Sequence, residues 1–159
     1  MPWGRSVPRG ERQGTRRVFT GEYRHSVDDK GRLAVPARCR AQLDDGAFVC
    51  KWIDGCLAIF PKSGWDTLAE KVSALPIADA DARAFSRFLF ASAFEVDLDR
   101  QGRVVVPAKL REHAKLENEA VVVGSRDHLE IWAPALWDAY SREMESPDAL
   151  LEHLAGLGI

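Results

Sequence analysis

Hydrophobic and polar residues alternate in one short stretch near the start of each half of the chain. The apolar or aromatic positions of the two stretches are Tyr23, His25, Val27, Phe94, Val96 and Leu98. A period of two residues is typical of a half-buried β-strand. Apolar runs rich in β-branched and aromatic residues follow at residues 47–52, 56–61, 120–125 and 129–134. We predict a strand in each of these stretches and runs.

Helices are predicted between these strands and after them. Pro36 and Pro107 each begin a short helix, over residues 37–43 and 108–114, because proline in a first turn removes no hydrogen bond. A longer helix is expected to close each half of the chain. Ser63 is the predicted N-cap of the first of these helices, and Pro134 the predicted start of the second.

Two further helices are predicted outside these halves. The segment 79–90 places Ala82, Phe85, Phe88 and Leu89 on one helical face, and residues 88–90 are too apolar to be left in water, so they mark a core or an interface. The C-terminal stretch is acidic, with leucines at near-helical spacing, and is expected to pack as a helix or to mediate a contact. These leucines are Leu150, Leu151, Leu154 and Leu157.

The chain contains an internal repeat. "DDKGRLAVP" at residues 28–36 returns as "DRQGRVVVP" at residues 99–107, and seven of the thirteen positions from 28–40 are identical in 99–111. The similarity extends on both sides, and Trp65 matches Trp137. We therefore interpret the chain as two homologous units.

The repeated segment predicts a tight turn that leads into a short strand. Residues 28–31 and 99–102 form the turns, and Gly31 and Gly102 are placed where φ is positive. The β-branched stretch after each turn is a strand. Each unit then has the order strand, strand, helix, strand, strand, helix. Because one such unit buries little, we predict that the two cover each other in a pseudo-twofold barrel of the α+β class.

The predicted domains follow from the repeat. Residues 1–17 are a basic extension, 18–75 the first unit, 76–90 a helical linker, 91–145 the second unit and 146–159 a C-terminal helix or tail.

The charge of the chain limits where a nucleic-acid surface could lie. The formal net charge is −2, but residues 1–17 hold five arginines and one acid, which leaves 17 basic and 23 acidic residues, a net charge of −6. Any surface for nucleic acid must therefore be local. The sequence contains no apolar run long enough for a transmembrane helix and no secretory signal, so we expect a cytoplasmic protein.

Neither catalytic nor metal-binding residues are indicated. Cys39, Cys50 and Cys56 lack C-x-x-C spacing and are read as small core residues. The four histidines, His25, His113, His128 and His153, show no ligand spacing. No Ser-His-Asp set or phosphate-cradling loop is present. We predict no cofactor, no metal, no small-molecule substrate and no enzymatic activity.

The motif arginines are candidate DNA readers. Arg32 and Arg103 begin the strand that leaves each turn, and a guanidinium fork can bond guanine O6 and N7 together in the major groove. Asp28 and Asp99 could accept a bond from the arginine or bond turn amides as an Asx-type cap. The glycines also remove bulk where backbone would approach DNA. On chemistry alone, a hairpin clasp without any ligand explains the motif as well.

Other basic residues surround the two motifs. Lys30 and Arg100 lie on the turns and are predicted to bind DNA, while Arg24, Arg38 and Lys109 are candidate phosphate contacts. Each could equally belong to a solvated face or a salt bridge. Arg40 and Arg111 recur in both short helices, which also fits a structural ion pair.

These residues resemble a known family. "GEYRHSVDDKGRLAVPARCR" and "DARAFSRFLFASAFEVDLDRQGRVVVP", with D-x-x-x-R at residues 28–32 and 99–103, are similar to the MraZ family over nearly all of residues 18–159. The resemblance implies two AbrB-like (SpoVT-AbrB) swapped-hairpin domains. It also implies a nucleoid-associated transcriptional regulator, generally a repressor of the promoter of the division and cell-wall gene cluster.

The resemblance further implies an assembly and a ligand. Family members form rings of eight or twelve subunits and bind guanine-rich direct repeats in double-stranded promoter DNA. The motif arginines read the DNA, which places that role on Arg32 and Arg103. Where the family usually begins "MFxGEY", this chain reads "VFTGEY" from Val18. We interpret residues 1–17 as an extension upstream of a native start at Val18, or alternatively as a basic arm that touches phosphates.

One rival function remains at this stage. An AbrB-type antitoxin or scaffold would share the hairpins and bind a protein partner. Antitoxins commonly carry a disordered acidic tail, whereas this C-terminus is short and rich in leucine, which favours the regulator.

Overall fold

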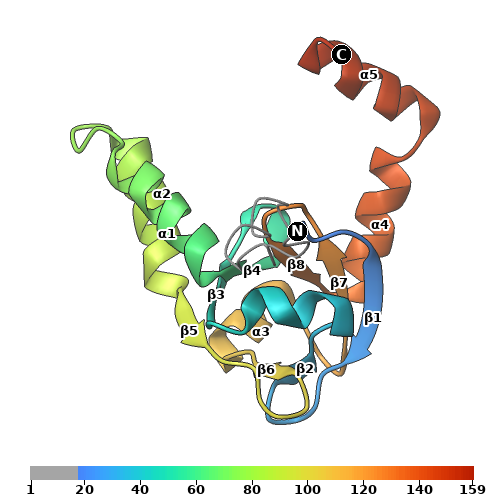
Figure 1. Ribbon diagram of the computed structural model, residues 1–159. Helices are drawn as coiled ribbons and strands as arrows, with labels where there is room; N and C mark the ends of the chain where they lie inside the picture. Colours follow the sequence, from blue (N-terminus) through green and yellow to red (C-terminus); the bar gives the residue numbers. More distant parts are fainter. Residues whose placement is uncertain (1–17) are drawn as a thin grey trace, which may run out of the picture.

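The computed structural model of the chain describes residues 18–159 (Figure 1). Both interpretations of residues 1–17 lie outside the described residues. The first unit contributes β1 (Glu22–Ser26), β2 (Arg32–Ala34), the 3-10 helix η2 (Ala37–Leu43), β3 (Ala47–Lys51), the 3-10 turn η3 (Ile53–Gly55), β4 (Leu57–Pro61) and α1 (Lys62–Ser73). Helix α2 (Ala80–Ser92) covers most of the predicted linker. The second unit contributes β5 (Phe94–Val96), β6 (Arg103–Val105), α3 (Ala108–Ala114), β7 (Glu119–Gly124), β8 (Leu129–Trp132) and α4 (Pro134–Met144), and the C-terminal stretch forms α5 (Pro147–Leu157).

The two units exchange their first strands. Six strands form one antiparallel sheet in the order β1-β7-β8-β4-β3-β5. The first strand of the first unit, β1, pairs with β7 of the second unit, and β5 of the second unit pairs with β3 of the first. The units therefore share a single sheet, as expected of two small units that cannot bury a core alone.

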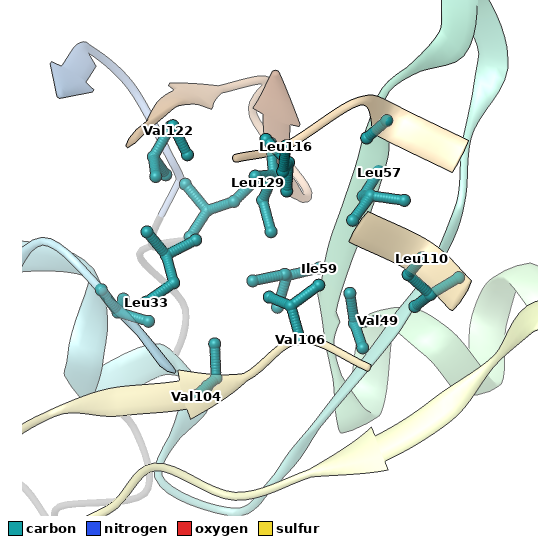
Figure 2. Close-up of a cluster of buried hydrophobic side chains, with 14 of the residues drawn as sticks. Leu33, Val49, Leu57, Ile59, Val104, Val106, Leu110, Leu116, Val122 and Leu129 are labelled. Carbon is teal, nitrogen blue, oxygen red and sulfur yellow. The ribbon is translucent and has the colours of Figure 1, made fainter. Parts of the chain in front are cut away.

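The second strands of the two units form a separate ribbon. Strands β2 and β6 pair antiparallel, with Arg32 opposite Val105, Leu33 opposite Val104 and Ala34 opposite Arg103. Leu33 and Val104 point inward and are at most 2% exposed. Figure 2 shows both side chains entering the main core with Val49, Leu57, Ile59, Val106 and Leu110. Because this face of the ribbon packs on the core, the opposite face, which carries both motif arginines, points to solvent.

Helices cover the remaining faces of the sheet. Trp65 of α1 and Leu89 of α2 close a second apolar cluster over Cys50 and Phe60. Trp132 is buried under Trp137 and Tyr140 of α4. Four of the tryptophans, Trp52, Trp65, Trp132 and Trp137, are buried or half-buried, which is typical of core or interface residues. The three cysteines are buried and free, as predicted, and burial raises the pKa of the Cys50 thiol to about 12.

The C-terminal helix stands apart from the body of the molecule. Figure 1 shows α5 projecting beyond α4 at the end opposite β2 and β6. It is a helix, as predicted, but its leucines do not pack on this chain: Leu151 is 67% exposed and Leu157 is 72% exposed. No helix in residues 18–159 is long and apolar enough to cross a membrane.

Three details differ from the predictions. Ser63 is not the N-cap of α1, which begins at Lys62 after Pro61 and has no side-chain cap. The fixed φ of Pro61 suits the residue before a helix, and the helix starts two residues earlier than predicted. The first short helix, η2, is a 3-10 helix rather than an α-helix. Within residues 18–159 the pairings do not close the six strands into a barrel, so the predicted barrel is not confirmed.

His128 is a buried histidine that joins the two units, and it should make stability depend on pH. Its Nδ1 lies 2.7 Å from Asp127 Oδ1 and its Nε2 lies 3.2 Å from Glu130 Oε2, while its ring stacks on Phe60. Burial lowers the pKa of His128, but the bonds to Glu130 and Asp127 outweigh it, so the net pKa is raised.

A raised pKa in the folded state means that the folded protein binds the proton more tightly than the unfolded chain does. This contribution is present in full below about pH 6.5 and is lost as the pH rises through the folded pKa of His128. We expect the free energy of unfolding to fall over that interval. In His128→Gln the fall should disappear, as measured by urea unfolding at a series of pH values. An equal fall in the variant would contradict this assignment.

Candidate nucleic-acid interface

The two motif turns form one end of the molecule. In Figure 1 the chain before β2 and the chain before β6 loop out side by side at the bottom of the view, away from α5 and from the connection of α1 to α2. Each turn is closed by a backbone hydrogen bond of 3.0 Å, from Gly31 N to the Asp28 carbonyl and from Gly102 N to the Asp99 carbonyl. We call this end, residues 28–34 and 99–105, the motif tip.

Each motif aspartate adopts both of the roles that the sequence left open. Asp28 Oδ1 accepts from the amides of Lys30 and Arg32, at 3.0 and 2.9 Å. Its Oδ2 accepts from Arg32 Nε. One carboxylate thus caps the turn and holds the arginine of its own motif.

The second motif repeats this arrangement. Asp99 Oδ1 accepts from the amides of Gln101 and Arg103, and its Oδ2 lies 3.0 Å from Arg103 Nε. The hydrogen bond from the Arg32 amide lowers the pKa of Asp28, and that from the Arg103 amide lowers the pKa of Asp99. Both carboxylates are therefore charged at neutral pH and can orient a guanidinium.

The side-chain hydrogen bonds from the two arginines to the aspartates are donated by Nε. In the part of the chain that the structure describes, the terminal Nη atoms of Arg32 and Arg103 make no protein hydrogen bond, and the only further ion pair joins Arg103 Nη1 to Asp28 Oδ2 at 4.0 Å. The side chains are 35% and 28% exposed. Ion pairs this exposed to solvent contribute little to stability. The clasp therefore does more to aim the two guanidinium ends than to stabilise the fold.

Gly31 and Gly102 have positive φ, at +81° and +74°, as predicted. The space beside each glycine is filled by the other unit, which gives a structural reason for glycine at both positions. Approach of their backbone to DNA stays a prediction. A Cβ on Gly31 would lie 2.5 Å from the Val106 carbonyl oxygen and 2.9 Å from Arg111 Nε. A Cβ on Gly102 would overlap the Arg40 side chain.

Arg40 and Arg111 hold the two motifs together. Arg40 Nε donates to the Val35 carbonyl at 2.9 Å, and Arg111 Nε donates to the Val106 carbonyl at 3.0 Å. Each guanidinium lies against the motif glycine of the opposite unit. Neither pairs with an acid among residues 18–159, which contradicts the alternative of a structural ion pair. Their recurrence in both helices was the only sequence signal of this role.

Nearly all of the described chain matches one protein family. Residues 18–88 and 89–154 each match the family described as "MraZ protein, putative antitoxin-like". The chain belongs to the MraZ family. A relative from Moorella thermoacetica is 46% identical over 143 residues, which are 89% of this chain and all of that protein. One from Thermomicrobium roseum is 50% identical over 122 residues, 77% of this chain and 86% of that protein. Both carry the name "Transcriptional regulator MraZ".

The remaining basic residues of this MraZ-family chain differ in whether their side chains form a salt bridge or are exposed to solvent. Arg24 Nη2 pairs with Asp138 Oδ1 of α4 at 2.6 Å, which ties it to the side of the body. Lys30 and Arg100 are exposed on the turns, and Arg38 and Lys109 are exposed in the first turns of η2 and α3. Phosphate contact by all of these side chains stays a prediction.

The motif tip is weakly positive on an acidic chain. Residues 28–34 and 99–105 hold four basic side chains, Lys30, Arg32, Arg100 and Arg103, against three acidic ones, Asp28, Asp29 and Asp99. One MraZ-family chain with so small a local charge would gain little affinity from phosphates alone. Tight binding to DNA would therefore need specific contacts with bases or several copies of the chain bound together.

Proposed function

We propose that this protein is a sequence-specific DNA-binding transcriptional regulator. The observation that carries the proposal is the outer face of the ribbon β2–β6, where two arginines are held by Nε and present free Nη ends. A free pair of Nη donors matches the O6 and N7 acceptors of guanine in the major groove. A two-stranded ribbon is narrow enough to enter that groove. The name borne by the curated relatives supports the same function.

The finer function follows the family resemblance. We propose that the DNA is a promoter with guanine-rich direct repeats, that it belongs to the division and cell-wall gene cluster, and that binding represses it. On this proposal the protein is found in the cytoplasm with the nucleoid, and Lys30 and Arg100 add contacts beside the reading arginines. Pairing of the two motifs on one ribbon suits a target in which guanines recur.

We propose further that copies of the chain assemble into a ring of eight or twelve. The exposed leucines of α5 support self-association, because a helix face this apolar is rarely left in water. A ring would present many weakly positive tips to one DNA, and linked sites raise the effective concentration at each repeat. Native mass spectrometry gives the number of subunits directly.

The experiment that tests the function is a binding comparison. The full chain is titrated into a labelled duplex taken from upstream of its own gene and into a duplex of the same composition with the order scrambled, at one fixed salt concentration. We expect tighter binding to the promoter duplex by at least about 1000-fold, the low end for specific binders. Equal binding to both would refute a sequence-specific regulator.

The second candidate is an antitoxin-like protein that binds a protein partner, which the description of the family as antitoxin-like favours. It calls for a stoichiometric partner that co-purifies with the chain from its own cells. Such a partner, together with equal binding to the promoter and scrambled duplexes, would move this candidate to the front.

A further inference from the structure

The outer face of the ribbon carries two side chains besides the arginines. Residues directly opposite each other in an antiparallel pair point to the same face. Arg32 lies opposite Val105 and Ala34 lies opposite Arg103. The face is therefore a block of four, in which the arginines occupy one diagonal and Ala34 and Val105 the other.

Val105 is exposed on this face. Its side chain is 51% exposed, whereas its neighbours Val104 and Val106 are at most 2% exposed. It is half-exposed although it lies on the same face as the two charged arginines. An isolated exposed valine needs no explanation by itself. The exposure of Val105 has an explanation here, because the residue lies next to two arginines that point to the same face.

We propose that Val105 is a specificity-determining residue that contacts the 5-methyl group of a thymine next to the guanines read by the arginines. This inference rests on the proposed function. In the major groove, the thymine methyl is the only apolar group that distinguishes base pairs, and apolar side chains read it. A valine opposite Arg32 on the ribbon would reach the base pair beside the one that the arginine bonds.

The internal repeat makes this contact unequal in the two motifs. Ala34 and Val105 occupy equivalent positions, as do Arg32 and Arg103. Alanine lacks the two methyl groups of valine and ends closer to the backbone. The two halves of the ribbon are thus alike in reading guanine and different in reading the neighbouring base, so one chain prefers an asymmetric site.

The test removes one methyl group from the DNA and, separately, the methyl groups of the protein. Each thymine in the promoter duplex is replaced in turn by deoxyuridine, which lacks only the 5-methyl group. Anisotropy then gives the affinity of wild type and of Val105→Ala for every duplex. We expect one thymine per repeat whose replacement weakens wild type about fourfold, the loss expected for one buried methyl group. The same replacement should leave Val105→Ala unaffected.

Ala34→Val is the matched gain-of-contact variant. It should acquire sensitivity to a second thymine, at the position related to the first by the pseudo-twofold symmetry of the ribbon. Because both positions face outward, we expect both variants to keep the thermal unfolding midpoint of wild type.

Two results would overturn the inference. In one, no deoxyuridine substitution matters, or it matters equally in wild type and Val105→Ala, while Arg32→Ala and Arg103→Ala still lose the preference for the promoter duplex. The proposed function then stands and only Val105 loses its role. In the other, the arginine variants also bind as wild type does, and the inference falls together with the proposed function.

Discussion

The double variant Arg32→Ala/Arg103→Ala is expected to lose about 100-fold or more in affinity for guanine-rich repeats. A bidentate bond between arginine and guanine discriminates by about 1–3 kcal/mol, so each single variant should lose about tenfold or more. Because the clasps with Asp28 and Asp99 are partly exposed, their loss should cost the fold little stability. Fluorescence anisotropy at fixed salt measures the affinity, and native mass spectrometry checks that assembly is unchanged.

Arg32→Lys/Arg103→Lys is the matched control for charge. Lysine keeps the positive charge but cannot present two coplanar donors to one base. We expect it to retain the affinity of wild type for scrambled DNA and to lose most of the preference for the repeats. Retention of the full preference by the lysine variant would show that charge alone, rather than the guanidinium fork, is what the DNA recognises.

Gly31→Ala is expected to be the most destabilising single methyl group that can be added to the motif tip. The residue has φ +81°, which costs an L-residue about 1–2 kcal/mol, and the new Cβ would lie 2.5 Å from the Val106 carbonyl oxygen. That oxygen belongs to the backbone of the other unit and cannot move alone. We expect a loss on the order of 3 kcal/mol in the free energy of unfolding, measured by urea denaturation at one protein concentration.

Two other glycines separate the causes of this loss. Gly55 has φ +80° with nothing within 4 Å of its added Cβ, so Gly55→Ala should show the φ cost alone, about 1 kcal/mol. Gly102→Ala should fall between the two, because the Arg40 side chain that it meets can swing away after giving up its bond to Val35. If Gly31→Ala costs no more than Gly55→Ala, the two motifs are not packed against each other as described.

The sequence predicted best the features that depend on residues close to one another in the chain. Positive φ at Gly31 and Gly102 follows from turn chemistry, and the two bonding roles of Asp28 follow from the reach of a short carboxylate. The strands follow from periodicity, and the two units follow from the repeat. Apart from the repeat, which compares distant segments, each of these features depends on residues that are close together in the sequence.

Features that depend on the other unit were not predictable in the same way. Periodicity gives a strand its faces but not its partner, so the exchange of β1 and β5 between the units could not be derived from it. The packing of Arg40 on Gly102, and of Arg111 on Gly31, depends on that exchange. The exposure of Val105 likewise depends on the pairing of β2 with β6, because "RVVV" alone reads as an evenly buried strand.

The central claim is that the paired arginines read guanine, and replacing single atoms of the DNA tests it most directly. Each guanine of the repeats is replaced by 7-deazaguanine, which has carbon in place of the N7 acceptor, and the affinities of wild type and Arg32→Ala/Arg103→Ala are measured. We expect the replacement to weaken wild type about tenfold at the guanines that are read, and to leave the double variant unchanged. Equal affinity of wild type for the normal and modified repeats, or an equal loss in both proteins, would contradict the claim.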